Sequence, residues 1–154
     1  MTAVTPWLMA QPFTSERRVR WGECDPAGVV YTPSFGDYVA EAFHTFMEAL
    51  LGGPLSRKMP ELDLGTPVKS LQFVFHRSLW PDDEFRISTL GGDIRNRSFD
   101  LAMEAHDTGG RHVFSARLGI ICVHTVQRES QAIPQALKER LQLYAARFPA
   151  PVAA

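Results

Sequence analysis

A carboxylate and a helix start lie close together near the beginning of the sequence. Asp25 stands in a Pro/Gly turn, and Thr32-Pro33 follows with the residue types of an N-cap and a first helical position. The first turn of a helix carries unpaired N–H groups and about half a positive charge. A carboxylate there could attack a carbonyl carbon or activate water, while the N–H groups hold the developing oxyanion. The spacing therefore predicts a minimal hydrolytic site.

The helix that would position this site is predicted to begin at Thr32-Pro33, and its apolar positions run from Phe35 to Leu51. Its apolar residues recur with the i, i+3, i+4, i+7 spacing of an amphipathic helix, and Gly52-Gly53-Pro54 ends it. We expect a buried face along the whole helix, packed on a sheet. That face comprises Phe35, Tyr38, Val39, Ala42, Phe43, Phe46, Met47, Leu50 and Leu51.

Strand patterns occupy the rest of the chain. A first strand is predicted before the turn, over residues 13–21, and residues 51–65 are predicted to be an irregular connection. Four runs with turn signals between them predict further strands, over residues 68–79, 84–95, 98–107 and 111–125. Gly91-Gly92 predicts a bulge or a bend, and Ile133-Pro134 opens a last helix with Leu137, Leu141 and Tyr144 inward. The fold class is therefore α+β, with a five- to six-stranded antiparallel sheet around one long helix.

Composition places the chain among ordinary globular domains. Its 154 residues are 45% hydrophobic and 21% charged with a net charge of −1, which predicts a single domain over residues 1–154. The balance of charge gives no support for a nucleic acid or membrane partner, and no apolar run is long enough to span a bilayer. Residues 1–12 and 149–154, rich in Ala and Pro, are expected to be loose termini. Without a signal peptide pattern, the expected location is cytoplasmic.

Neither the cysteines nor the histidines have the spacing of a metal site. Cys24 and Cys122 are far apart, and the five histidines form no ligand motif. We therefore expect no metal and no bound cofactor.

One block and two shorter motifs resemble a known family. Residues 21–33 read WGECDPAGVVYTP, with Gly65-Thr66-Pro67 and residues 95–99 (RNRSF) further along. Together these are similar to the signature of the 4-hydroxybenzoyl-CoA thioesterase family. The resemblance implies a hotdog fold and hydrolysis of an acyl-CoA thioester, with CoA as part of the substrate. It also implies a homodimer that pairs into a homotetramer.

The resemblance assigns roles to the first block. It makes Asp25 the nucleophile or the general base, two roles that stay open. The alternative is an Asp that only stabilises its turn through an Asx-type hydrogen bond. The backbone N–H of Thr32 would be the oxyanion donor, at a position where well-studied members carry Tyr. Tyr31 would line the acyl pocket or be a core aromatic, and Gly28 would shape the turn.

The two distal motifs are expected to contact the substrate. Thr66 matches a loop that in the family reaches the active site of the neighbouring subunit; otherwise it begins a strand. Arg95, Arg97 and Ser98 match residues that hold the phosphates of CoA, for which guanidinium groups are suited; otherwise the arginines are solvated surface charges.

One departure concerns the acyl group. Members that hydrolyse hydroxylated aromatic thioesters carry an acidic side chain where this chain has Ala40. A group that reads a hydroxyl discriminates sharply, so a less polar acyl group is expected, benzoyl or a short to medium aliphatic chain. The alternatives are an acyl-carrier-protein thioesterase and a non-catalytic protein that binds acyl thioesters.

Overall fold

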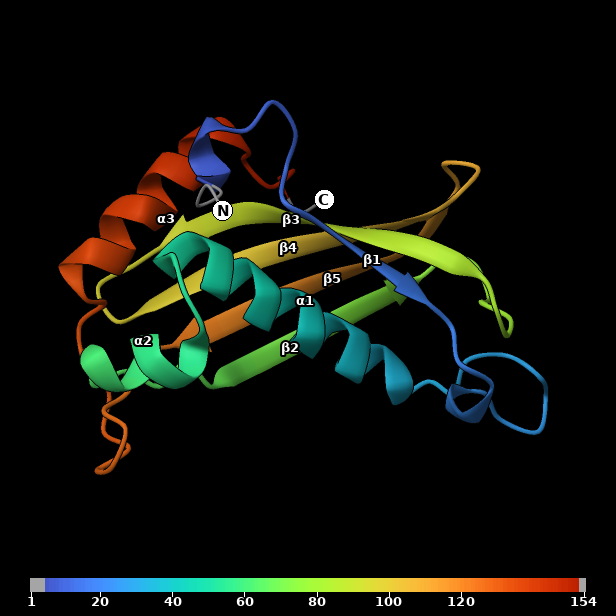
Figure 1. Cartoon of the computed structure of the whole chain (residues 1–154), viewed down its shortest axis with the longest axis horizontal. Coiled ribbons are helices and arrows are strands. Elements are labelled where there is room, and N and C mark those ends of the chain that lie inside the picture. The colour runs from blue at the N-terminus through green and yellow to red at the C-terminus, as the bar shows by residue number, and fades with distance from the viewer. Residues whose placement is uncertain (1–4, 153–154) are drawn as a thin grey trace.

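A five-stranded antiparallel sheet with one long helix across it forms the centre of the protein (Figure 1). The computed structural model describes residues 5–152. The strand order is β1-β3-β4-β5-β2. The strands are β1 (Thr14–Arg18), β2 (Val68–Phe75), β3 (Glu84–Ile94), β4 (Ser98–Asp107) and β5 (His112–Ile121). The predicted α+β hotdog fold is confirmed, with β1 and β2 at the two edges.

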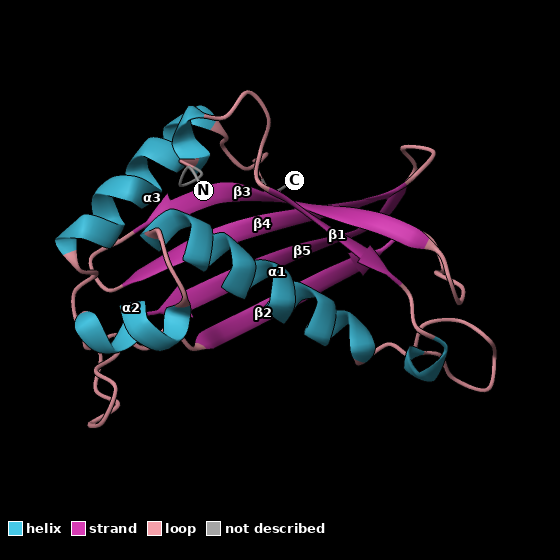
Figure 2. Cartoon of the chain, viewed as in Figure 1, coloured by secondary structure: helices cyan, strands magenta, loops and turns pink. Residues whose placement is uncertain are grey.

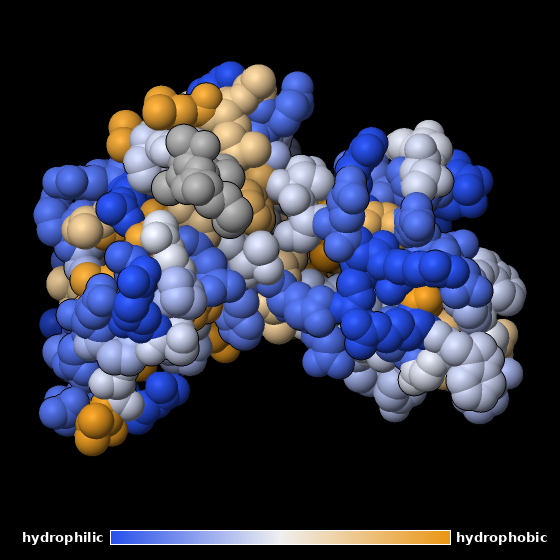
Figure 3. Space-filling model, viewed as in Figure 1, coloured by the Kyte–Doolittle hydropathy of each residue, from blue (hydrophilic) through white to orange (hydrophobic). Residues whose placement is uncertain are grey.

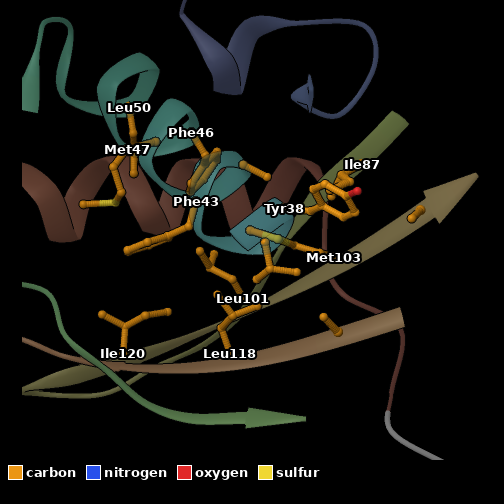
Figure 4. Packing of buried hydrophobic residues seen from close by; sticks show 14 of the residues in the cluster. Tyr38, Phe43, Phe46, Met47, Leu50, Ile87, Leu101, Met103, Leu118 and Ile120 are labelled. Atoms are coloured by element: carbon orange, nitrogen blue, oxygen red, sulfur yellow. The ribbon is translucent and has the colours of Figure 1, made fainter. Parts of the chain in front are cut away.

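Helix α1 (Ser34–Leu51) packs on one face of the sheet. Its buried residues are the nine of the predicted stripe, and they lie against side chains of β4 and β5 such as Leu101, Met103 and Leu118 (Figure 4). Burial of one such side chain contributes roughly 1.5–3 kcal/mol. The opposite side of α1 is exposed, and hydrophilic side chains cover much of this face of the molecule (Figure 3).

Helix α3 (Gln135–Arg147) packs beside α1 and against β3 (Figure 2). Its Leu137, Leu141 and Tyr144 are buried as predicted. The Tyr144 hydroxyl donates to the carbonyl of Thr89 at 2.6 Å and accepts from the Phe13 N–H at 2.9 Å. Burial raises the pKa of Tyr144 to about 12, so the hydroxyl stays protonated and keeps donating.

The predicted bulge at Gly91-Gly92 is confirmed, because the pairing of β3 with β4 shifts between Gly91 and Ile94. Close packing between β3 and α3 requires a glycine at position 91. A Cβ on Gly91 would lie 2.5 Å from the Cα of Ala145 in α3.

The expectation of an irregular connection over residues 51–65 is wrong. A second helix, α2 (Leu55–Glu61), follows Pro54. The carboxylate of Glu48 caps it by accepting from the Leu55 N–H at 3.2 Å. Leu55 and Met59 pack against the core. Their i, i+4 spacing was the available signal, and Pro60 in the last turn obscured it.

Several predicted boundaries are too wide. The first strand ends at Arg18, since a 3₁₀ turn (η2, Trp21–Glu23) follows. The run over residues 68–79 is a strand only to Phe75, and that over residues 111–125 only from His112 to Ile121. Strands β3 and β4 follow their predicted runs to within one residue.

Particular residues in the described part of each terminus contact the rest of the protein, although Leu8 and Val152 are largely exposed. Near the N-terminus, a 3₁₀ turn (η1, Pro6–Leu8) brings Trp7 against the core. At the other end, the Ala150 N–H donates to the carbonyl of Gly91 at 2.7 Å. Residues 1–4 and 153–154 were also expected to be loose, but they lie outside the described part of the chain.

None of the helices formed by residues 5–152 has the length and apolar character needed to cross a membrane.

Candidate active site

Asp25 lies in a tight turn held by its own backbone. Its N–H donates to the carbonyl of Val29 and its carbonyl accepts from the N–H of Gly28, both at 2.9 Å. The carboxylate atom Oδ1 accepts from the N–H of Ala27 at 2.9 Å, which is the Asx-type bond of the alternative interpretation. Within residues 5–152 the other oxygen, Oδ2, makes no hydrogen bond. One oxygen therefore orients the carboxylate and the other is available for chemistry.

Thr32 lies just before α1, but it does not cap the helix as predicted. The helix begins at Ser34, and the Thr32 side chain makes no capping bond. Residues 31–33 instead form a turn, in which the carbonyls of Tyr31 and Thr32 accept from the N–H groups of Ser34 and Phe35 at 2.8 and 3.2 Å. The Thr32 N–H has no acceptor in the described part of the chain. It is a free donor at the positive end of the helix.

Asp25 and Thr32 line the same pocket, with a volume of about 400 Å³. The pocket lies at the end of β2 that carries Phe75. Its other lining residues are Val29, Val30, Phe35, Phe75, His76, Arg77, Ser78 and Leu79. The ring of Phe35 is buried and lies 4.9 Å from that of Phe75, so the two form an aromatic wall. The residue with the free carboxylate oxygen, the residue with the free N–H and a set of apolar side chains therefore line one space.

Gly28 shapes this turn as predicted by its residue type. Its φ is +86°, a conformation that L side chains rarely adopt. The Trp80 ring covers it, 3.5 Å from the place of a Cβ.

Cys24, next to Asp25, is a poor nucleophile. Burial raises the pKa of its thiol, and the negative charges of Asp25, Glu23 and Asp83 raise it further. The thiol rather than the reactive thiolate is the form at neutral pH.

Tyr31 is not among the residues that line this pocket, and its side chain is 54% exposed. The sequence prediction missed three polar lining residues instead: His76, Arg77 and Ser78. The run over residues 68–79 predicted an unbroken strand, and nothing in it signals that the strand stops at Phe75. Ala40 lies on the exposed side of α1 and does not line the pocket.

Thr66 and the two arginines lie at the other end of the sheet. Thr66 precedes β2, whereas Asp25 lies beyond the end of that strand. Arg97 lies near Thr66. The Arg97 carbonyl accepts from the N–H of Cys122. Val123, which follows Cys122, forms a β-bridge with Gly65, the residue before Thr66. The predicted site residues thus fall into two groups, one at each end of the sheet.

Both arginines make internal contacts. Arg95 donates to both carboxylate oxygens of Asp100, at 3.0 and 2.6 Å, and to the Ser98 hydroxyl at 2.9 Å. Arg97 donates to the carbonyl and hydroxyl of Ser130, at 3.1 and 2.8 Å. Ser98 itself is buried.

A larger hollow of about 590 Å³ lies between the C-terminal segment and the sheet. Its polar residues include Gln72, Asp100 and Arg117, but Asp100 pairs with Arg95, and Arg117 donates to the carbonyl of Pro151 at 2.7 Å. The smaller pocket is lined both by Asp25 and by Thr32, whose free N–H lies at the positive end of α1, and is therefore the candidate site. Across residues 5–152, no three His, Cys, Asp or Glu side chains group in a way that could hold a metal ion.

A long helix over a five-stranded antiparallel sheet, with a carboxylate turn at its start, defines a hotdog-fold domain of the thioesterase class. The model of the Thioesterase-like superfamily matches residues 19–141, and the chain belongs to this superfamily.

Individual relatives agree with this assignment. The chain is 29% identical over 92 residues to a 4-hydroxybenzoyl-CoA thioesterase from Pseudomonas sp. strain CBS-3, a match that spans 59% of this chain and 65% of that protein. It is 26% identical over 122 residues to a 1,4-dihydroxy-2-naphthoyl-CoA hydrolase from Thermosynechococcus vestitus, covering 79% of this chain and 83% of the relative. The solved structure of the Pseudomonas thioesterase superimposes with a TM-score of 0.77 at 25% identity, over 85% of this chain and 99% of that one.

Proposed function

We propose that the protein is an acyl-CoA thioesterase that uses Asp25 and the Thr32 N–H. The observation that supports the proposal is the pocket that Asp25 and Thr32 both line, the first with a free carboxylate oxygen and the second with a free N–H. The N–H would hold the oxyanion that forms when the thioester carbonyl is attacked. A thiolate with a reference pKa of about 8.5 leaves without a dedicated acid, so the pocket needs no further proton donor.

Two routes use the same groups. As nucleophile, Asp25 attacks the carbonyl carbon, the C–S bond breaks, and CoA thiolate leaves an acyl-aspartyl anhydride that water hydrolyses. As general base, Asp25 takes a proton from water while the water oxygen attacks; the thiolate leaves and then takes up that proton. Both routes yield the free acid and CoA.

The walls of the pocket favour an aromatic acyl group. Phe35, Phe75, Val30 and Leu79 are apolar, and Asp25 is the single acid that lines the pocket. The named relatives act on hydroxybenzoyl-CoA and dihydroxynaphthoyl-CoA. Since this pocket offers no second carboxylate to a ring hydroxyl, we propose a preference for benzoyl over 4-hydroxybenzoyl thioesters.

We further propose that the chain works as a dimer joined along β2. The edge of β3 is covered by β1 and then by the C-terminal segment at Gly91. The outer edge of β2, in contrast, is unpaired within the described residues. Four large apolar residues of β2 are 42–49% exposed, and a long apolar edge of this kind needs a cover. These residues are Val68, Leu71, Val74 and Phe75.

A two-fold axis through the middle of β2 would pair the strand antiparallel with its copy. Residues near the start of one β2 would then lie beside the end of the other. This arrangement would place Thr66 of the partner subunit opposite Arg77, at the mouth of the Asp25 pocket. The separation of the two groups of site residues in one chain therefore supports a site built from two chains. Pairing of two dimers into a tetramer remains part of the proposal.

Replacement of Asp25 by Asn tests the reaction. Asn keeps the size of the side chain but neither attacks carbon nor deprotonates water. We expect kcat for benzoyl-CoA to fall by at least roughly 100-fold with KM little changed. Asp82→Asn, which removes an exposed charge outside the pocket, is the matched control. Near-normal turnover by a stable Asp25→Asn protein would remove Asp25 from the mechanism.

A further inference from the structure

Glu23, two residues before Asp25, is the most connected side chain around the candidate site. Its side chain is 18% exposed, and three donors from different parts of the chain converge on it. Oε1 accepts from the Arg20 N–H at 2.7 Å and from the Tyr38 hydroxyl at 3.0 Å. Oε2 accepts from the Arg17 guanidinium at 2.5 Å. One carboxylate thus joins β1, the 3₁₀ turn η2 and α1.

The backbone of Glu23 makes a second set of contacts. Its carbonyl accepts from the Tyr31 N–H at 2.9 Å and from the Ser34 hydroxyl at 3.4 Å. Tyr31 immediately precedes Thr32, and Ser34 is the first residue of α1. An isolated bridge between Cys24 and Val30 closes the loop between these contacts. The two ends of the loop that carries Asp25 are therefore both fixed at Glu23.

The groups around Glu23 are suited to hold it in one place. Tyr38 is 1% exposed. Burial is the main cause that raises the pKa of its hydroxyl, and the hydrogen bond to Glu23 raises it further, so the hydroxyl donates rather than ionises. The Arg17 guanidinium also contacts Glu41 and lies over the Tyr38 ring, 4.9 Å from its centroid. Burial alone would lower the pKa of Arg17, but the hydrogen bond to Glu41 and the charge of Glu23 raise it overall.

We propose that Glu23 is a positioning residue, which fixes the Asp25 carboxylate relative to the Thr32 N–H through its contacts with Arg17, Tyr38 and Tyr31. This inference rests on the proposed function of Asp25. Glu23 takes no part in bond making, because its oxygens are already occupied by the three donors. Its effect is geometric: a small displacement between an attacking group and an oxyanion donor can cost about 100-fold in rate.

The chemistry of the three donors explains why a carboxylate is needed. Arg17, Tyr38 and the Arg20 N–H all donate, so they require an acceptor-only group. The amide of a Gln would place its own NH₂ against one or more of them. Glu23→Gln is therefore a nearly isosteric change that loosens the loop.

The test compares four variants of the full chain by thiol release from benzoyl-CoA and by amide hydrogen exchange at Tyr31. Glu23→Gln is expected to lower kcat by about 10-fold or more, to leave KM within twofold, and to speed exchange of the Tyr31 N–H. Glu41→Gln, which removes the exposed partner of the same arginine, is the control and is expected to change neither. Tyr38→Phe removes one donor from Glu23, and we expect a fall in kcat of about threefold. Asp25→Asn is expected to lower kcat by at least roughly 100-fold without faster exchange at Tyr31.

The outcomes separate the two proposals. If Asp25→Asn is inactive but Glu23→Gln turns over like Glu41→Gln, the positioning role is overturned and the proposed function stands. If Asp25→Asn keeps its turnover, both fail. Should Glu23→Gln not fold, Tyr38→Phe decides: an unchanged kcat would overturn the inference, and a lowered kcat at unchanged KM would support it.

Discussion

The guanidinium of Arg95 donates to both carboxylate oxygens of Asp100, with Nη1 3.0 Å from Oδ2 and Nη2 2.6 Å from Oδ1. The two side chains are 45% and 38% exposed, and a pair that exposed contributes little, about 0–1 kcal/mol. Asp100 therefore competes with any phosphate for Arg95, but a phosphate could displace it.

This competition gives the first prediction. If Arg95 and Arg97 hold the phosphates of CoA, replacing both by Ala should raise KM about 10-fold or more with kcat little changed. Asp100→Ala, which releases Arg95, should lower KM. Steady-state kinetics with benzoyl-CoA measure both effects. Unchanged KM in the double variant would show that these arginines serve only their internal contacts with Ser98, Asp100 and Ser130.

The second prediction concerns the open edge of β2. Leu71→Lys places a charge on a residue that is 44% exposed and that the proposed dimer would cover. We expect the dimer to dissociate and turnover to fall with it, measured by light scattering and thiol release at micromolar concentration. Val126→Lys, at a loop position that is 84% exposed, should change neither. A wild-type chain that is active as a monomer would contradict the two-chain site.

Sequence patterns predicted the parts of this fold that depend on local periodicity. The stripe of α1 from Phe35 to Leu51 is all on one face, so spacing alone identifies it. Gly91-Gly92 marks the bulge, because Gly91 packs closely against α3 and Gly92 against the backbone of β4, so neither position admits a side chain. Helix α2 was missed, since its seven residues are too short for a clear period and include Pro60.

The site was predicted only in part, because its remaining contacts are not local. The block from Trp21 to Pro33 predicted roles for Asp25 and Thr32, and the structure shows that both line one pocket. Arg95, in the connection between β3 and β4, pairs with Asp100 of β4. The sequence does not show which side chains of a hairpin lie on the same face of the sheet. Equally, the convergence of Arg17 and Tyr38 on Glu23 joins residues of β1 and α1, and no local pattern connects them.

The third prediction uses the thiol of Cys24 to report on Asp25. Burial and then the Asp25 charge raise the pKa of Cys24. A raised pKa keeps the neutral thiol to higher pH, so the pH profile of alkylation should lie above that of a free cysteine, about 8.5. Asp25→Asn removes one negative charge and should move the profile to lower pH.

Alkylation by iodoacetamide, followed by mass spectrometry between pH 7 and 10, measures the Cys24 profile. Cys122, which is fully buried and whose pKa burial raises to about 11, should remain unmodified over this range while the protein stays folded. Asp82→Asn should leave the Cys24 profile in place. A profile that also stays in place in Asp25→Asn would show that the carboxylate does not face this side of the turn.

The fourth prediction separates strain in the Asp25 turn from strain elsewhere. Gly28 and Gly110 both have positive φ, +86° and +80°, and neither has an atom closer than 3.5 Å to the place of a Cβ. An Ala at either position is therefore strained by backbone conformation rather than by a clash, at a cost of roughly 1 kcal/mol. Both variants should show a similar fall in melting temperature.

Only the Gly28 N–H donates to the carbonyl of Asp25, at 2.9 Å, so only Gly28→Ala should also reorient the carboxylate. We expect kcat to fall about 10-fold or more in Gly28→Ala and to be unchanged in Gly110→Ala. Equal turnover by the two variants, at equal loss of stability, would show that the geometry of this turn does not limit the reaction.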